Sequence, residues 1–183
     1  VYGQRQTDVN MLRTKFPEAH TSTRPPEENE RTGIACLDAI GLAKGAITEI
    51  VGETEGCGAG LLIAALLHRE TTVREPTALV DARDVFDPCS VPPSALNRLL
   101  WVRCREVPKA MRVTDLLLRD GNLPLVILDL QAHASREVQR VPASSWHRLR
   151  VLAEKSGAAL CAFTPCRTVP CARARLMLEH RFT

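Results

Sequence analysis

The stretch that decides the fold is Ala46-Ile-Thr-Glu-Ile-Val-Gly-Glu-Thr-Glu-Gly-Cys-Gly-Ala59. Its first six residues, AITEIV, are mostly apolar or β-branched and predict a buried strand. Gly52 to Gly60 is rich in glycine and predicts a loop, and Leu61 to Arg69 is strongly apolar and predicts a helix. A strand, a glycine-rich loop and a helix in this order form the setting that a phosphate-binding loop requires.

The alternation of strands and helices continues to the end of the chain. Further strands are predicted at Thr77–Asp81, Leu100–Cys104, Leu123–Leu130 and Ala158–Phe163, and Arg173–Phe182 has the partial alternation of a half-exposed edge strand. Helices are predicted at Val107–Arg119 and at Ser144–Ser156 with Ser144 as the cap, and Ser94 is expected to cap a short helix through Leu99. The pattern predicts an α/β fold, a mostly parallel sheet flanked by helices.

The N-terminal residues differ from the rest and divide the chain into two regions. Residues 1–31 are predicted to be an arm and linker, and residues 32–183 the core. Val9, Leu12 and Phe16 are spaced to line one face of a short helix, and Thr21–Glu30 is polar and rich in proline. We expect this helical arm to pack on a partner or on its own core, or else to form a disordered end.

The composition of the chain is that of a globular domain, with no sign of a membrane span or a disulfide framework. The chain has 183 residues, 45% of them hydrophobic, and a net charge of +3, as expected for a globular domain. No apolar run approaches the roughly 18 residues of a membrane span. Seven cysteines occur without a C-x-x-C pair, which indicates free thiols in the reducing cytoplasm. Of the 24 basic residues all but four are Arg, a residue suited to contacts with phosphate or protein. The alternative is that a GC-rich genome favours Arg codons over Lys codons.

The glycine-rich loop has the position of a phosphate-binding loop without its chemistry. Against the pattern G-x-x-x-x-G-K-[ST], Gly52 fits the first glycine, but the second glycine falls on Cys57, the lysine on Gly58 and the hydroxyl residue on Ala59. The acidic residues Glu53 and Glu55 would repel phosphate. We therefore interpret the loop as vestigial, a degenerate strand-to-helix turn, with Gly52, Gly56, Cys57, Gly58 and Ala59 as its site residues.

Several stretches resemble the RecA recombinase superfamily, in the family's order and over roughly residues 32–183. They are Thr32–Asp38, Lys44–Gly52, Leu79–Pro88 and Leu125–Asp129. The resemblance places Asp129 at the metal-side aspartate of the Walker B strand, although it can equally be an aspartate bonded to local backbone. It places Arg83 where the family has its catalytic glutamate, and a cation cannot activate water as a base does.

The C-terminal part resembles the same family with its loops shortened. Ala158–Thr164 resembles the strand that ends in the family's nucleotide-sensing glutamine, but Pro165 and Cys166 follow it here. The family's long DNA-binding loop shrinks to about Pro165–Ala172, and the earlier one after Asp129 is also short. The resemblance therefore implies a predicted pseudo-ATPase with no catalytic residues and no cofactor, in which ATP binding is not expected.

Within the superfamily, three segments look most like the ImuA proteins, accessory factors of bacterial SOS mutagenesis. They are Leu12–Ala19, Thr32-Gly-Ile and Arg98-Leu-Leu-Trp-Val102. This resemblance implies an adaptor in error-prone translesion synthesis. Its expected partners are an ImuB-like protein, RecA and an error-prone DNA polymerase, and its expected place is the bacterial cytoplasm, at the nucleoid after damage. DNA contact would be weak or indirect.

Basic residues gather in the C-terminal third. They are candidate contacts to a partner or to DNA, as are Leu12 and Phe16 of the arm, and the alternative is that they form a solvated face. The basic residues are Arg136, Arg140, Arg148, Arg167, Arg173 and Arg175. The turn with Arg83, Asp84 and Asp87 is expected to be held by salt bridges. The histidines 133, 147 and 180 lack metal-ligand spacing, so each is interpreted as a surface or interface residue and no metal site is predicted.

Three other functions remain open. One is a DNA-dependent ATPase that uses Asp129 with Lys44, or an Arg supplied by a second subunit, as its cation. Another is a RecA-like SOS inhibitor of cell division. The last is a recombinase-like DNA-binding protein that acts through the C-terminal arginines, with steeply salt-dependent affinity.

Overall fold

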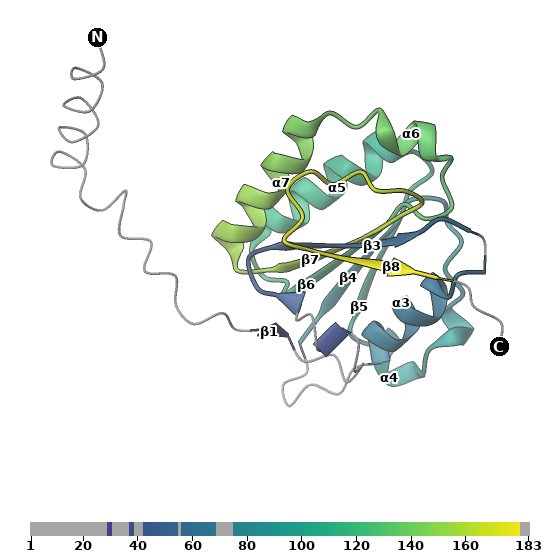
Figure 1. Cartoon of the computed structure of the whole chain (residues 1–183). Helices are drawn as coiled ribbons and strands as arrows, with labels where there is room; N and C mark the ends of the chain where they lie inside the picture. The colour runs from purple at the N-terminus through teal and green to yellow at the C-terminus, as the bar shows by residue number, and fades with distance from the viewer. Residues whose placement is uncertain (1–28, 31–36, 39–41, 55, 69–74, 180–183) are drawn as a thin grey trace, which may run out of the picture.

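A six-stranded parallel sheet forms the centre of the molecule (Figure 1). The structure is a computed structural model, and it describes residues 29–30, 37–38, 42–54, 56–68 and 75–179. The strands lie in the order β5-β4-β6-β7-β3-β8, and every neighbouring pair is parallel. Their bounds are β3 (Ile47–Gly52), β4 (Thr77–Asp81), β5 (Leu99–Arg103), β6 (Leu125–Asp129), β7 (Ala159–Thr164) and β8 (Ala174–Leu178). The predicted α/β class and parallel sheet are confirmed.

Helices cover both faces of the sheet (Figure 1). On one face lie α5 (Val107–Asp120), α6 (Ser135–Gln139) and α7 (Ala143–Ser156), and on the other α3 (Ala59–His68) and α4 (Pro93–Leu96). The four inner strands are buried along their whole length, whereas β5 and β8 at the edges are partly exposed. Within the described residues, no helix has both the length and the apolarity needed to cross a membrane.

Two apolar cores result, one on each face. Trp146 and Leu149 of α7 pack with Val126 and Leu128 of β6 in the first. In the second, α3 packs on the opposite face of the same strands. Because side chains alternate between the two faces of a strand, a strand buried on both sides must be apolar at nearly every position.

Both predicted helix caps are wrong. Ser94 and Ser144 lie inside the first turns of α4 and α7, and the cap positions are taken by Pro92 and Pro142, which make no side-chain cap bond. Proline has its φ fixed near the value seen here and needs no N–H partner, so each helix begins without a hydroxyl cap.

Some short elements were not predicted. One is α6. Another is the antiparallel pair of β1 (Asn29–Glu30) with β2 (Leu42–Ala43), and it joins residues from the two sides of the predicted boundary at residue 31. The predicted arm helix with Leu12 and Phe16 lies outside the described residues.

The connection from β7 to β8 is unusually short for a parallel crossover. Nine residues, 165–173, carry the chain from β7 past β3 to β8, where a dozen or more with a helix are usual. The loop packs against the sheet without a helix, with Val169 fully buried. The short segment predicted between these strands is confirmed. Because the loop is packed against the sheet without a helix, some of its backbone N–H groups lie in the interior and need hydrogen-bond acceptors.

Glu49 of β3 supplies those partners. Its side chain is fully buried, and Oε1 accepts from the N–H groups of Thr168 and Val169 at 2.8 and 3.0 Å and from the Thr164 hydroxyl at 3.1 Å. Oε2 accepts from Arg175 Nε at 2.5 Å. One carboxylate therefore holds both the crossover and the edge strand.

We expect Glu49→Ala to lower the free energy of unfolding by about 3–5 kcal/mol, the usual cost of removing one partner of a buried ion pair. It would leave two loop N–H groups and the Arg175 guanidinium without their acceptor. Urea unfolding followed by circular dichroism measures this. The control is Glu154→Ala, which removes an exposed pair with Arg150 and should cost under about 1 kcal/mol. Equal losses in the two variants would contradict this role for Glu49.

Candidate functional site

A cleft of about 1090 Å³ opens at the carboxyl ends of the strands. It is lined mainly by the loop after β3 with the start of α3, by the turn after β4 and by the segment after β6. In parallel α/β sheets this edge is where ligands bind. All of the predicted vestigial-loop residues, together with Arg83 and Asp129, line this cleft, so the structure brings them together.

The loop keeps the backbone shape that glycine allows. Gly56 and Gly58 have φ values of +75° and +91°, in the region that side chains disfavour. α3 then begins at Ala59, and Leu62 N–H donates to Gly58 O at 3.0 Å. A turn of this kind requires its glycines whether or not phosphate binds, which agrees with a strand-to-helix turn.

Two side chains fill the space beside Gly52. A Cβ atom added at Gly52 would collide with Cys57 Sγ and would lie 3.0 Å from Gln131 Nε2. Gln131 Nε2 also donates a hydrogen bond to Gly52 O, while Gln131 Oε1 is buried without a partner. Gly52 is thus needed for close packing between the loop and the segment after β6.

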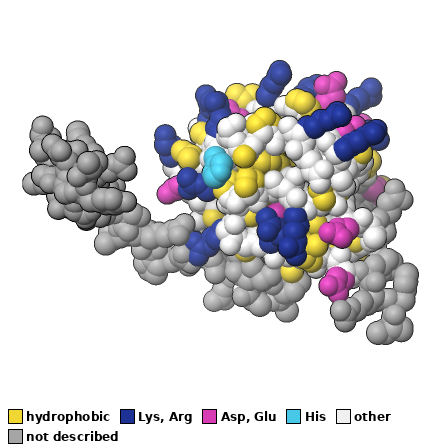
Figure 2. Space-filling view, turned by 45° about the horizontal axis from the view of Figure 1, so that its top comes forward, with side chains coloured by type: hydrophobic (Ala, Val, Ile, Leu, Met, Phe, Trp, Pro, Cys, Tyr) yellow, Lys and Arg dark blue, Asp and Glu magenta, His cyan; other side chains and the backbone are white. Residues whose placement is uncertain are grey.

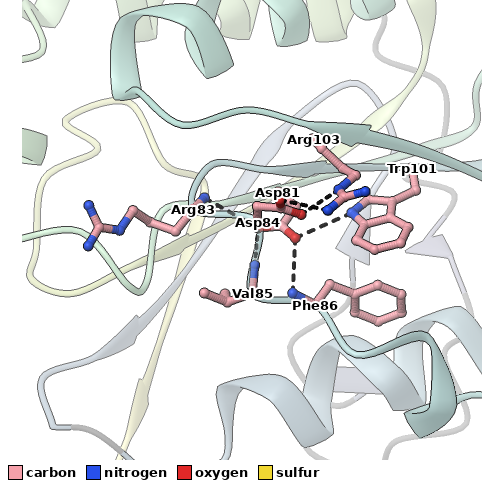
Figure 3. A network of polar contacts seen from close by, with 7 residues as sticks. All are labelled: Asp81, Arg83, Asp84, Val85, Phe86, Trp101 and Arg103. Atoms are coloured by element: carbon pink, nitrogen blue, oxygen red, sulfur yellow. Dashed lines mark hydrogen bonds and ion pairs between the residues drawn. The ribbon is translucent and has the colours of Figure 1, made fainter.

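Asp81 fixes the turn that follows β4 (Figure 3). Its fully buried carboxylate accepts from the N–H groups of Arg83, Val85 and Phe86 at 3.3, 3.1 and 2.9 Å, and from Trp101 Nε1 at 3.3 Å. Phe86 packs edge-on against Trp101, with ring centroids 5.3 Å apart. With four donors around it, Asp81 is a structural anchor of the turn.

Arg83 is exposed and lines the cleft, pointing away from the Asp81 carboxylate in Figure 3. The expected salt bridges of this turn are found in part. Asp84 pairs with Arg103 at 2.5 Å, and this ion-paired hydrogen bond lowers the pKa of the Asp84 carboxyl. Asp87 instead accepts from Cys89 N–H at 2.9 Å and caps a short 3₁₀ turn.

Asp129 ends β6 directly beside Asp81, its register partner on β4. Its Oδ1 accepts from Gln131 N–H at 2.9 Å, so the structure shows the local backbone bond that was one of the two interpretations of this residue. Burial raises the pKa of Asp129 to about 6, and the neighbouring Asp81 charge adds to the rise, although the Gln131 N–H opposes it.

His133 is buried, which corrects its interpretation as a surface residue. Its Nδ1 lies 2.9 Å from Glu137 Oε2 and its Nε2 lies 3.0 Å from Ala82 O. The hydrogen bond from His133 lowers the pKa of Glu137. Because both ring nitrogens are engaged, His133 ties α6 to the turn after β4 and is not placed to act as a base.

The candidate contact arginines occupy different surroundings. Arg136 and Arg140 are exposed at α6, and Arg167 and Arg173 are exposed on the crossover. Arg148 pairs with Asp115 at 2.5 Å, and Arg175 is committed to Glu49 and to Val169 O. Leu12 and Phe16 lie outside the described residues. These arginines therefore do not form one continuous site in the cleft.

Sequence reasoning missed three site residues, Asp81, Gln131 and His133, as contributors to the cleft. Of these three, only Asp81 has a feature in the sequence that could have indicated its role, because an aspartate at the end of an apolar strand often accepts hydrogen bonds from the following turn. Gln131 and His133 act on partners 79 and 51 residues away, and no local pattern predicts that. Lys44, the alternative cation, precedes β3. It therefore lies near the amino ends of the strands, whereas the glycine-rich loop lies at their carboxyl ends.

No protein-family model and no curated protein matches this chain in sequence. In the part of the chain that the structure describes, no three His, Cys, Asp or Glu side chains are grouped to hold a metal ion.

The pKa of Asp129 predicts a pH-dependent stability. Its value of about 6 in the folded chain lies above the value of about 3.9 for an unfolded carboxyl. The folded chain then binds the proton more tightly, so stability falls as pH rises from about 4 to about 6. We expect Asp129→Asn to be more stable than the parent by about 3 kcal/mol at neutral pH, and close to it near pH 4.

Urea unfolding of both proteins at the two pH values tests this. Asp120→Asn changes an exposed carboxyl and should keep the parent's pH dependence. A variant that is less stable than the parent at neutral pH would show that the charged Asp129 is stabilised in the fold. Stabilisation of the parent by Mg²⁺, absent in Asp129→Asn, would indicate a metal site instead.

Proposed function

We propose that this chain is a non-catalytic RecA-like adaptor, which binds other proteins and does not turn over nucleotide. The observation that carries the proposal is the composition of the cleft. It lies where a nucleotide would bind, yet its loop offers no lysine or hydroxyl at the start of α3, and Arg83 stands where a general base is expected.

Hydrolysis of a nucleotide makes three demands that these residues do not meet. The β- and γ-phosphates need a cation, but position 58 is glycine and the exposed Glu53 adds negative charge. Magnesium needs a hydroxyl at the start of the helix as well as a carboxylate, but position 59 is alanine. The attacking water needs a carboxylate or amide to orient it, and at the position where the resemblance expects a glutamate the side chain is Arg83.

The rim of the cleft is better suited to protein than to nucleotide. Leu61 of α3 is 78% exposed and Val85 of the turn is 57% exposed, and both line the cleft. Apolar side chains that stand out beside a concave surface are typical of protein contact sites. A partner that covered them would also close the cleft.

The resemblance to ImuA supplies the expected setting. The partners would be an ImuB-like protein and RecA, together with an error-prone DNA polymerase, and the process would be translesion synthesis after DNA damage. The alternatives differ in outcome: a DNA-dependent ATPase predicts turnover that Asp129→Ala abolishes, and an inhibitor of cell division predicts capture of a division protein.

We expect no nucleotide binding and no hydrolysis. Fluorescent ATP and ADP analogues with Mg²⁺ should give no saturable signal, and steady-state phosphate release should equal the buffer blank, with and without single-stranded DNA. The variant Ala59→Thr restores the missing hydroxyl at the start of α3 and leaves the positive-φ Gly58 in place, so any binding that it gained would be due to that group alone. Turnover by the parent chain would overturn the adaptor proposal in favour of an ATPase.

We expect the apolar rim to be needed for partner binding. Leu61→Ser/Val85→Ser should weaken binding to an ImuB-like protein by about tenfold or more, as expected when two apolar anchors are lost. Isothermal titration calorimetry measures this. Leu100→Ser, at an exposed leucine on the edge strand β5, is the control and should bind like the parent. Unchanged affinity in the double variant would exclude the cleft rim as the contact.

A further inference from the structure

A second cavity, separate from the cleft, lies on the helical face of the molecule. It has a volume of about 600 Å³ and runs between α5 and α7, with α6 and the residues after it at one end. Its lining is largely apolar and includes Val107, Met111, Leu116, Val141, Pro142 and Leu149. Figure 2 shows hydrophobic side chains on this face with Lys and Arg side chains among them.

The groove has a closed floor and an open side. Val107, Met111 and Leu149 are buried and form part of the core beneath it. Leu116 on α5 is 64% exposed, so it stands at the rim without being covered by the rest of the chain. A partly exposed leucine above a packed apolar floor can receive a side chain from outside without any rearrangement of the core.

The charges around the groove are mainly positive. Arg112, Arg140 and Arg148 line it, and two acidic residues, Asp115 and Glu137, line it as well. Both acids are already engaged within the chain. Asp115 pairs with Arg148 at 2.5 Å and with Arg119 at 2.8 Å, and Glu137 pairs with His133 at 2.9 Å. Arg112 and Arg140 are therefore the charges that a bound molecule would meet.

We propose that this groove docks an acidic, amphipathic segment of a partner protein. Apolar side chains of the segment would enter between α5 and α7, and its carboxylates would lie against Arg112 and Arg140. The lining is too apolar for a phosphate backbone, whose recognition rests on polar and charged contacts. A second copy of this chain would bring the same arginines face to face, which like-charge repulsion disfavours.

The inference goes beyond the proposed function and does not depend on it. None of the described residues lines both the groove and the cleft, because α6 lies between them, with Ser135 on the cleft side and Glu137 on the groove side. Binding at the groove can therefore be tested while the state of the cleft is unknown.

The test uses a fluorescein-labelled peptide of about 14 residues, with Leu at i, i+3, i+4 and i+7 and Glu between them, the pattern of an acidic amphipathic helix. Anisotropy titrations with the full chain should show saturable binding. A matched peptide with Lys in place of Glu, and another with Ser in place of Leu, should bind about tenfold more weakly or not at all.

Variants of the chain locate the binding. Arg140 follows α6, and Arg140→Glu should weaken binding of the acidic peptide by about tenfold, whereas Arg136→Glu, on α6 but outside the groove, should not. Leu116→Ser should weaken it similarly, whereas Val151→Ser, at an exposed residue of α7 outside the groove, should not. Thermal melts of all four variants check that each is folded.

Three outcomes would overturn the inference. The first is equal weakening by the groove variants and their controls, or no saturable binding of the acidic peptide. The second is tighter binding of a single-stranded DNA oligonucleotide that Arg140→Glu abolishes, which would make the groove a nucleic-acid surface. The third is a dimer in sedimentation that Leu116→Ser dissociates, which would assign the groove to a second copy of the chain.

Discussion

The Asp81 carboxylate accepts four N–H donors at the end of a central strand, and the geometry of the cleft depends on this. Three of the donors belong to the turn that carries Arg83, and the fourth is the indole of Trp101 on the neighbouring strand. A buried carboxylate is stable only when its oxygens are satisfied in this way. The same bonds hold in place the turn from which Arg83 and Val85 reach the cleft.

Glu49 solves a related problem on β3, which lies three strands away from β4 in the sheet. The nine-residue crossover places its backbone in the interior, and a helix, which would satisfy its own N–H groups, is too long for it. Glu49 accepts from two of these groups and from Arg175. The loop is therefore short and held from within, and its backbone needs no helix to satisfy these groups.

The sequence predicted the strands well and the site less well, for a physical reason. Each inner strand is a run of apolar residues, because both of its faces are covered, and such runs are visible locally. The helix starts at Pro92 and Pro142 were misplaced because a hydroxyl two residues later gave a competing cap signal. His133 and Arg175 could not be placed at all, since their partners are 51 and 126 residues away and a lone histidine or arginine resembles any surface residue.

The position of α6 bears on how an adaptor of this kind could work. This helix is five residues long and borders both the cleft and the groove. His133, before it, bonds to Ala82 at the turn fixed by Asp81, and also to Glu137 within it. A partner at the groove and a partner at the cleft would thus contact surfaces that the two hydrogen bonds of His133 join, one of them buried and the other partly exposed. In the adaptor that we propose, two such partners would be bound on either side of α6, and these bonds would help to set the separation between them.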